Sequence, residues 1–126
     1  MPAYDTSHFD PPAPLAQVTL RNPERNTELA DVAMLLDSGA DVTLVPRSAV
    51  QMLGVDIGLE ASYELMGFDG NISVAPAVEL DLVFLKRIFR GRFLIIDRER
   101  GILGRDVLNH TALLFDGPQL TWSEER

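Results

Sequence analysis

One stretch decides how this chain folds: residues 34–45, which read MLLDSGADVTLV. Its first residues end an apolar run, three small residues follow at 38–40, and apolar residues resume at Val42. Apolar runs bounded by turn residues are typical of buried strands. The stretch therefore predicts a buried strand, a tight turn that carries the Asp37 carboxylate, and a second strand.

The segments on both sides of this stretch predict further strands. Residues 78–84 alternate apolar side chains with Glu79 and Asp81, which is a half-buried strand pattern, and residues 93–96 are uniformly apolar. The other predicted strands are residues 17–20, 29–36, 63–66, 71–75, 113–115 and 119–122. Turn compositions at 22–26, 67–70 and 116–118 separate them. The pairs 63–66 with 71–75 and 113–115 with 119–122 are expected to form hairpins.

Helical residues are few. Pro46 and Gly54 bracket a short helix predicted over residues 47–53, because proline is tolerated at a helix start and glycine ends helices. A second helical piece is predicted around residues 105–109. Many strands and one or two short helices indicate a mainly β fold, a small barrel-like or sandwich arrangement.

The N-terminal residues 1–14 hold four of the eight prolines. Proline lacks a backbone N–H and restricts the chain, so this segment is expected to lack regular structure and to form a flexible arm. Residues 15–126 are then expected to form a single domain, since this length supports one hydrophobic core.

Composition limits the classes of function. The 126 residues are 46% apolar and 24% charged, as in soluble globular proteins. The chain has no cysteine for disulfides or thiolate metal sites, and His8 and His110 are too isolated to indicate a metal centre. No apolar run reaches the roughly 20 residues that span a bilayer, and residues 1–5 lack a signal-peptide pattern. We expect a cytoplasmic protein with no cofactor, no metal and no membrane partner.

Charge argues against nucleic acid as a partner. The formal net charge is −8, whereas phosphate binding relies on basic surface. Seven of the eleven basic residues nevertheless lie between Lys86 and Arg105. Basic side chains on solvated strand edges and turns explain this cluster; a local patch for an acidic substrate or RNA is the alternative.

Two further segments accompany the Asp37 turn. Residues 102–108 read ILGRDVL, with Gly104 67 positions after Asp37. Between the two lies the predicted hairpin whose turn is residues 67–70. Together, these three segments resemble the retropepsin-like (retroviral-type) aspartic proteases over about residues 17–122. In that family an Asp-Thr/Ser-Gly turn carries the catalytic aspartate, and an apolar-apolar-Gly-Arg-Asn/Asp segment packs beneath it.

This resemblance implies a small closed β-barrel with a flap hairpin, and aspartic endopeptidase activity. Such an enzyme needs two catalytic aspartates, and this chain has no second Asp-Ser/Thr-Gly. The resemblance therefore implies a homodimer that acts on a peptide or protein substrate. Two Asp37 carboxylates, one from each copy, would hold one proton between them and activate a water. The chain ends, residues 17–20 and 119–122 with Trp122 as an anchor, would interleave at the dimer interface, and self-cleavage near residues 10–16 is conceivable.

The resemblance also assigns roles to other residues. Asp37 is the catalytic residue, supported in its loop by Ser38, Gly39 and Ala40. Asp41 would contact the substrate main chain or pair with Arg105. Substrate contacts are implied for Asp41, Val42, Leu44, Ile102 and the flap residues Gly67, Phe68, Asp69 and Gly70. Gly104, Arg105 and Asp106 would support the site structurally.

Two other interpretations remain open at this point. A retropepsin fold with little or no proteolysis would serve as a peptide- or protein-binding module, because a fold does not guarantee an activity. Alternatively, the chain is a monomeric β-barrel in which Asp37 lies in an ordinary turn, since Asp, Ser and Gly are common in turns.

Overall fold

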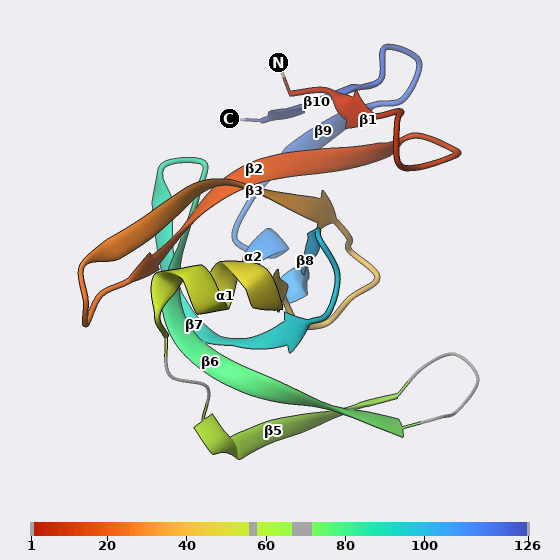
Figure 1. The fold of residues 1–126 in the computed structure, drawn as a ribbon. Coiled ribbons are helices and arrows are strands. Elements are labelled where there is room, and N and C mark those ends of the chain that lie inside the picture. Colours follow the sequence, from red (N-terminus) through yellow and green to blue (C-terminus); the bar gives the residue numbers. More distant parts are fainter. Residues whose placement is uncertain (1, 56–57, 67–71, 126) are drawn as a thin grey trace.

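Six strands of the chain form a closed barrel around an aliphatic core (Figure 1). A computed structural model describes residues 2–55, 58–66 and 72–125. Around the barrel, the strands follow the order β2 (Ala13–Asn22), β3 (Thr27–Leu36), β8 (Gly101–Leu103), β4 (Leu44–Pro46), β7 (Arg87–Ile96) and β6 (Ile72–Phe84). The barrel closes where residues 19–21 of β2 pair antiparallel with residues 81–83 of β6. The predicted mainly β, closed-barrel fold is confirmed.

The core is made by the alternating apolar residues of these strands. Val18 and Leu20 of β2 and Leu80 and Leu82 of β6 are at most 2% exposed. Leu20 lies opposite Leu82 across the closing pair. Burial of these side chains is the main favourable contribution to folding of a domain of this size.

Asp81 departs from the alternation expected in β6. Its side chain is only 1% exposed, and the Arg90 guanidinium on β7 donates to both of its carboxylate oxygens, at 2.9 and 3.1 Å. The hydrogen bonds from Arg90 lower the pKa of Asp81, against the opposing effect of burial. Asp81 lies between Arg21 of β2 and Arg90 of β7 in the sheet, and local alternation does not reveal these pairings with distant strands.

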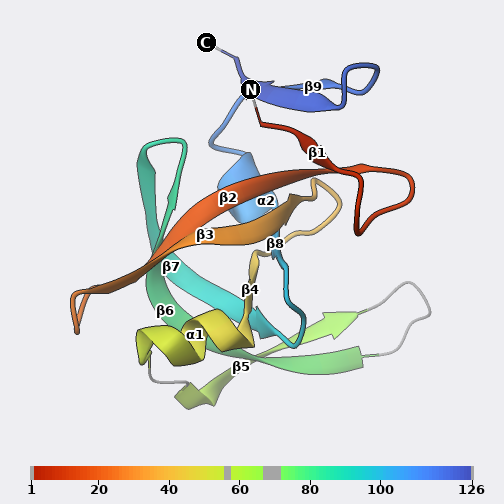
Figure 2. The same cartoon turned by 45° about the horizontal axis from the view of Figure 1, so that its top comes forward.

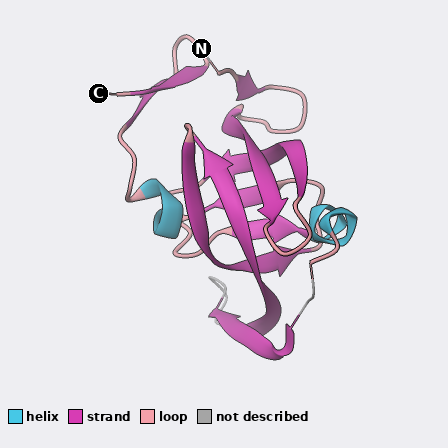
Figure 3. Cartoon of the chain, turned by 90° about the vertical axis from the view of Figure 1, so that its left-hand side faces the viewer, coloured by secondary structure: helices cyan, strands magenta, loops and turns pink. Residues whose placement is uncertain are grey.

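Two helices lie on opposite sides of the barrel (Figure 3). Helix α1 spans Arg47–Leu53 as predicted, and Gly54 ends it in the left-handed conformation, with φ of 70°. Helix α2 is shorter, Arg105–Leu108, at the predicted position. Among the described residues, no helix has the length and apolar character that crossing a bilayer requires.

A long hairpin extends from the barrel at the end opposite the chain termini (Figure 2). Strand β5 (Gly58–Met66) pairs antiparallel with the first half of β6, up to Met66 opposite Ile72. The predicted pairing of 63–66 with the strand after 71 is therefore confirmed. The flap residues Gly67, Phe68, Asp69 and Gly70 lie outside the described residues.

The terminal segments form a separate small sheet beside the barrel (Figure 1). Strands β9 (Leu113–Asp116) and β10 (Thr121–Glu124) make the predicted C-terminal hairpin. On the other side of β10, Ala3 forms a bridge with Thr121, and the Trp122 N–H donates to the Pro2 carbonyl at 3.0 Å. Strand β1 (Tyr4–Asp5) continues this segment and pairs with β2. The expectation that this segment lacks regular structure does not hold at residues 3–5 and 13–14, where Ala3 pairs with β10 and β1 pairs with the start of β2.

The expected interleaving of residues 17–20 with a second copy was also wrong. These residues belong to β2, whose neighbours β3 and β6 lie in the barrel of the same chain. Trp122 is 3% exposed, packs against Phe84, and donates from Nε1 to the Leu15 carbonyl at 2.9 Å. Trp122 thus anchors the terminal sheet to its own barrel.

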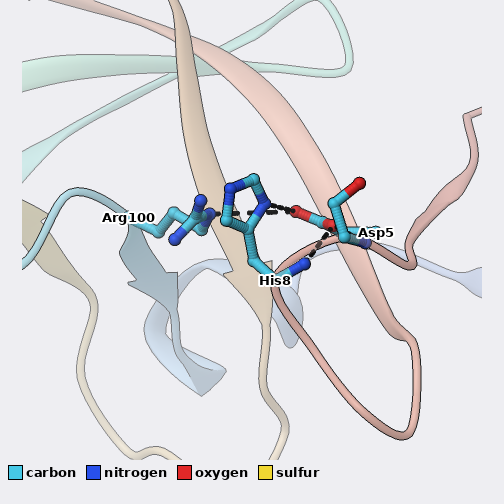
Figure 4. Close-up of polar contacts among 4 residues, drawn as sticks. Asp5, His8 and Arg100 are labelled. Carbon is cyan, nitrogen blue, oxygen red and sulfur yellow. Dashed lines mark hydrogen bonds and ion pairs between the residues drawn. The ribbon is translucent and has the colours of Figure 1, made fainter.

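An ion cluster holds the loop after β1 (Figure 4). The Asp5 carboxylate accepts the main-chain N–H groups of Ser7 and His8, at 2.8 and 3.0 Å. Its other oxygen lies 3.0 Å from His8 Nδ1 and 3.8 Å from Arg100 Nε. The His8 main-chain hydrogen bond is the largest cause of a lowered pKa at Asp5. This cluster ties the N-terminal loop to the residue that precedes β8.

Candidate active site

Asp37 is the first residue after β3, where the chain leaves the barrel wall. Strands β3 and β8 run parallel, with Leu36 beside Leu103. The Asp37 N–H donates to the Leu103 carbonyl at 3.1 Å, so the ladder between the two strands continues to the aspartate. The main chain at Asp37 is thereby positioned by regular β-sheet hydrogen bonding.

The loop from Asp37 to Thr43 turns tightly around the carboxylate. The Gly39 N–H donates to Asp37 Oδ1 at 2.9 Å, and the Ala40 N–H donates to the Asp37 carbonyl at 3.2 Å. Asp37 is half-buried, while Ser38 and Gly39 are exposed. Oδ2 of Asp37 accepts no hydrogen bond from another described residue, so one oxygen is oriented by the loop and the other remains available.

Gly104 supports this loop from beneath. A Cβ atom at this buried glycine would lie 2.5 Å from both the carbonyl carbon and the oxygen of Val42. Only glycine therefore allows the β8–α2 junction to approach the loop this closely. The next residue, Arg105, donates its N–H to the Ala40 carbonyl at 2.9 Å and so fixes the middle of the loop.

Thr43 links the loop of residues 37–43 to the β8–α2 junction by hydrogen bonds. Its hydroxyl donates to Asp106 Oδ1 at 2.6 Å and accepts the Gly104 N–H at 3.0 Å, and its own N–H donates to Asp106 Oδ2 at 3.0 Å. Thr43 is fully buried. Sequence reasoning missed this residue, although a hydroxyl between two apolar residues was a usable signal, because a buried polar group needs partners.

Arg105 is placed differently from the expectation. Its guanidinium donates to the Ser38 carbonyl at 2.7 Å, and no ion pair joins it to Asp41 in the described residues. Asp41 is exposed. The arginine therefore stabilises the loop through its backbone, and Asp41 keeps its carboxylate in solvent.

The expected pocket residues lie near the loop. Val42 and Leu44 are half-buried and pack against Ala77 and Leu94, in a cluster separate from the main core. Ile102 is half-buried and lies opposite Leu44. Partial exposure of these apolar side chains beside Asp37 is compatible with contact to a ligand.

The hairpin and the loop lie on the same side of the molecule. In Figures 1 and 2, the free ends of β5 and β6 extend toward the side on which residues 37–43 leave the barrel. The hairpin and the catalytic loop therefore face the same side of the barrel.

One half-exposed carboxylate on a rigid loop can accept or donate a proton, but it cannot do both at once. Within residues 2–55, 58–66 and 72–125, no three acidic or histidine side chains gather as a metal site would require. Asp37 is placed where its carboxylate could exchange a proton with a ligand.

Comparisons with known proteins agree with this geometry. The family model described as aspartyl protease matches residues 17–107. A search of curated protein sequences gives no significant match.

Solved structures share the fold at low sequence identity. A retropepsin-like aspartic protease from Rickettsia conorii is 16% identical, with a TM-score of 0.60 over 99% of this chain and 90% of that one. The EIAV protease complexed with the inhibitor HBY-793 is 21% identical, with a TM-score of 0.59 over 84% and 91%. The retroviral protease-like domain of Ddi1 from Leishmania major is 14% identical, with a TM-score of 0.52 over 89% and 87%.

Proposed function

We propose, from the premise that this chain belongs to the retropepsin-like aspartic protease family, that it is an aspartic endopeptidase whose active site is shared by two copies. The observation that carries the proposal is the placement of Asp37. Its carboxylate lies half-exposed on a loop that the β8–α2 junction holds at four residues, and the chain has no second Asp-Ser/Thr-Gly turn. A twofold-related copy would supply the missing carboxylate.

The reaction follows from two such carboxylates close together. Like charges at short separation do not both ionise readily, so the pair holds one proton. The ionised Asp37 removes a proton from a bound water, which attacks the peptide carbonyl, while the protonated Asp37 donates a hydrogen bond to the carbonyl oxygen. Proton transfer to the leaving nitrogen then breaks the C–N bond and releases the two peptide products.

The surrounding residues have supporting roles in this proposal. The Gly39 N–H orients Asp37 Oδ1, and Gly104 with Thr43 keeps the loop from moving. Val42, Leu44 and Ile102 offer apolar contacts to substrate side chains, and Asp41 offers a carboxylate to the substrate main chain. The flap residues 67–70 would close over the bound peptide and exclude water.

The proposal is tested by cleavage of a diverse peptide library from acidic to neutral pH. The wild-type chain should cleave, and Asp37→Asn should lose at least about 10³-fold in rate, since the amide cannot act as the base. Asp31→Asn is the matched control, because Asp31 is exposed on strand β3, lies outside the proposed site and should leave cleavage unchanged. Equal cleavage by wild type and Asp37→Asn would contradict the proposal, and no cleavage by wild type would leave a peptide-binding module as the better description.

A further inference from the structure

Residues 97–100 connect β7 to β8 as a series of bends rather than as a strand. Ion pairs hold both ends of this connection: Arg47 of α1 contacts Asp97, and Asp5 of the N-terminal segment contacts Arg100. The side chains of Asp5 and Arg100 are only 18% and 24% exposed, whereas that of Asp97 is 73% exposed. The pair at Arg100 is therefore the better protected from water and salt.

Two side chains of the N-terminal segment hold Arg100. Its Nε lies 3.8 Å from Asp5 Oδ2 (Figure 4), and its guanidinium carbon lies 5.9 Å from the centre of the Phe9 ring. An arginine over an aromatic face is attracted by the charge distribution of the ring. Asp5 is itself oriented by the main-chain N–H groups of Ser7 and His8, which donate to its other oxygen. Asp5, Phe9 and Arg100 thus form a clamp between the N-terminal segment and the start of β8.

Strand β8 carries the effect of the clamp to the catalytic loop. Gly101 follows Arg100 and is buried, and a Cβ atom there would lie 2.3 Å from Met34 Sδ. The strand is only three residues long, and the carbonyl of its last residue, Leu103, accepts the Asp37 N–H at 3.1 Å. Because a short, closely packed strand moves as a unit, a displacement at Arg100 also displaces the Leu103 carbonyl.

We propose that the N-terminal segment positions the catalytic loop: Asp5 and Phe9 hold Arg100, and Arg100 sets the position at which β8 supports Asp37. This inference rests on the proposed function, because it assigns the clamp a role in the turnover of that active site. Arg100 does not touch the reacting atoms and is therefore a positioning residue. The segment that precedes the barrel thus contributes to the geometry of the half-site in its own chain.

A purely structural role for the clamp makes a different prediction. If the clamp only adds to global stability, its loss lowers the fraction of folded protein but leaves the turnover number of each folded molecule unchanged. If the clamp positions β8, its loss lowers the turnover number, whereas KM, which depends on the apolar contacts of Val42, Leu44 and Ile102, changes little.

The first test removes the arginine and compares the result with a neighbouring arginine. Arg100→Ala should lower the turnover number about tenfold and change KM less than about twofold, because a small misplacement of a catalytic group is costly. Arg98→Ala is the matched control and should cleave like wild type, since Arg98 is exposed in the same connection and is in none of the ion pairs of the described residues. Arg100→Lys keeps the charge beside Asp5 but loses the planar group over Phe9, and it should recover part of the turnover number.

A double-variant cycle tests whether Asp5 acts through Arg100. Asp5→Asn should lower the turnover number less than Arg100→Ala does, because Phe9 still contacts the guanidinium. Asp5→Asn combined with Arg100→Ala should lose no more than Arg100→Ala alone. Additive losses would show that Asp5 acts by another route and would contradict the clamp.

Hydrogen exchange tests the inference without any cleavage. The Asp37 amide, which is bonded to the Leu103 carbonyl, should exchange with solvent at least about tenfold faster in Arg100→Ala, whereas the amides of β6 should keep their wild-type rates. Unchanged exchange at Asp37, or equal acceleration at Asp37 and in β6, would overturn the positioning role. If the wild-type chain cleaves no peptide, the proposed function fails, and the exchange rates still decide whether the clamp positions the loop.

Discussion

The catalytic loop and the terminal sheet differ in how completely one chain stabilises them. The loop at residues 37–43 is held by the Leu103 carbonyl, by close packing of Gly104, and by the hydrogen bonds of Thr43 and Arg105. The terminal sheet is attached through Trp122 and the pairing of residues 2–5, and among the described residues its outer strand β9 pairs only with β10. A preformed loop needs no partner to adopt its shape, whereas the terminal sheet leaves apolar surface that a partner would cover. The geometry of the half-site is thus encoded within one chain, whereas the terminal sheet exposes apolar side chains such as Leu114 and Phe115.

The largest effect is expected at Gly104. In Gly104→Ala the new Cβ would meet backbone atoms of Val42 at 2.5 Å, and backbone cannot rotate away as a side chain can. We expect a loss of about 3 kcal/mol in the free energy of unfolding, measured by urea denaturation, together with loss of cleavage. Gly117→Ala is the control: no atom lies within 4 Å of its Cβ position, so its stability should stay within about 0.5 kcal/mol of wild type. Equal stability of the two variants would show that the loop is not held by close packing.

Thr43 should have the next largest effect. Thr43→Val keeps the shape of the side chain but removes the hydroxyl that accepts the buried Gly104 N–H. Because a buried donor is then left unsatisfied, we expect a loss of about 2 kcal/mol in the free energy of unfolding. Cleavage should fall through the turnover number more than through KM, because the hydrogen bonds of Thr43 position the loop that carries the catalytic Asp37. Thr43→Ser retains the hydroxyl and should keep most of the wild-type stability and most of the turnover number. If Thr43→Ser lost as much activity as Thr43→Val, the methyl group and not the hydrogen bonds would matter.

A smaller effect is expected in the terminal sheet. Trp122→Phe removes the hydrogen bond to the Leu15 carbonyl and should cost about 1 kcal/mol in unfolding free energy. Because Trp122 anchors the terminal sheet to the barrel, amide hydrogens of β9 and β10 should exchange faster with solvent, while those of the barrel core change little. Unchanged exchange in β9 and β10 would show that this hydrogen bond does not hold the terminal sheet, and would weaken the contrast between the two regions.

The smallest effect concerns pH and the loop that follows β1. The pKa of Asp5 is lowered, first by the His8 main-chain N–H, and a lowered carboxyl pKa adds stability above the unperturbed value of 3.8. Attachment of the loop should therefore persist above that pH and weaken as pH falls through the lower folded-state pKa. The amide chemical shifts of Ser7 and His8 report this transition, and Asp5→Asn should abolish it. A transition that survives in Asp5→Asn would assign it to another group.

Local patterns predicted much of the fold and the site. The helix between Pro46 and Gly54 and the packing of Gly104 follow from residue types whose backbone preferences are strong. The tight turn at Leu85 and Lys86 has φ of 53° and 64° without glycine or asparagine, so no local signal marked it. Its geometry comes from the long antiparallel pairing of β6 with β7.

Other features depended on contacts between distant segments. The burial of Asp81, the pairing of residues 2–5 with β10, and the bond from Arg105 to the Ser38 carbonyl join positions far apart in the chain. Periodicity describes one strand at a time and does not say which strand covers it. The flexibility of residues 1–14 and the roles of the flap residues stay predictions.

The claim that two copies share one active site is tested most directly by mixing subunits. Wild-type chain at fixed concentration is incubated with increasing Asp37→Asn chain, with substrate in excess, and the cleavage rate is measured. Random pairing of two-chain sites predicts that an equal amount of Asp37→Asn reduces the rate to about half, and that larger excesses reduce it further. A rate that stays constant under excess Asp37→Asn would show that each chain acts alone, and would contradict the shared site.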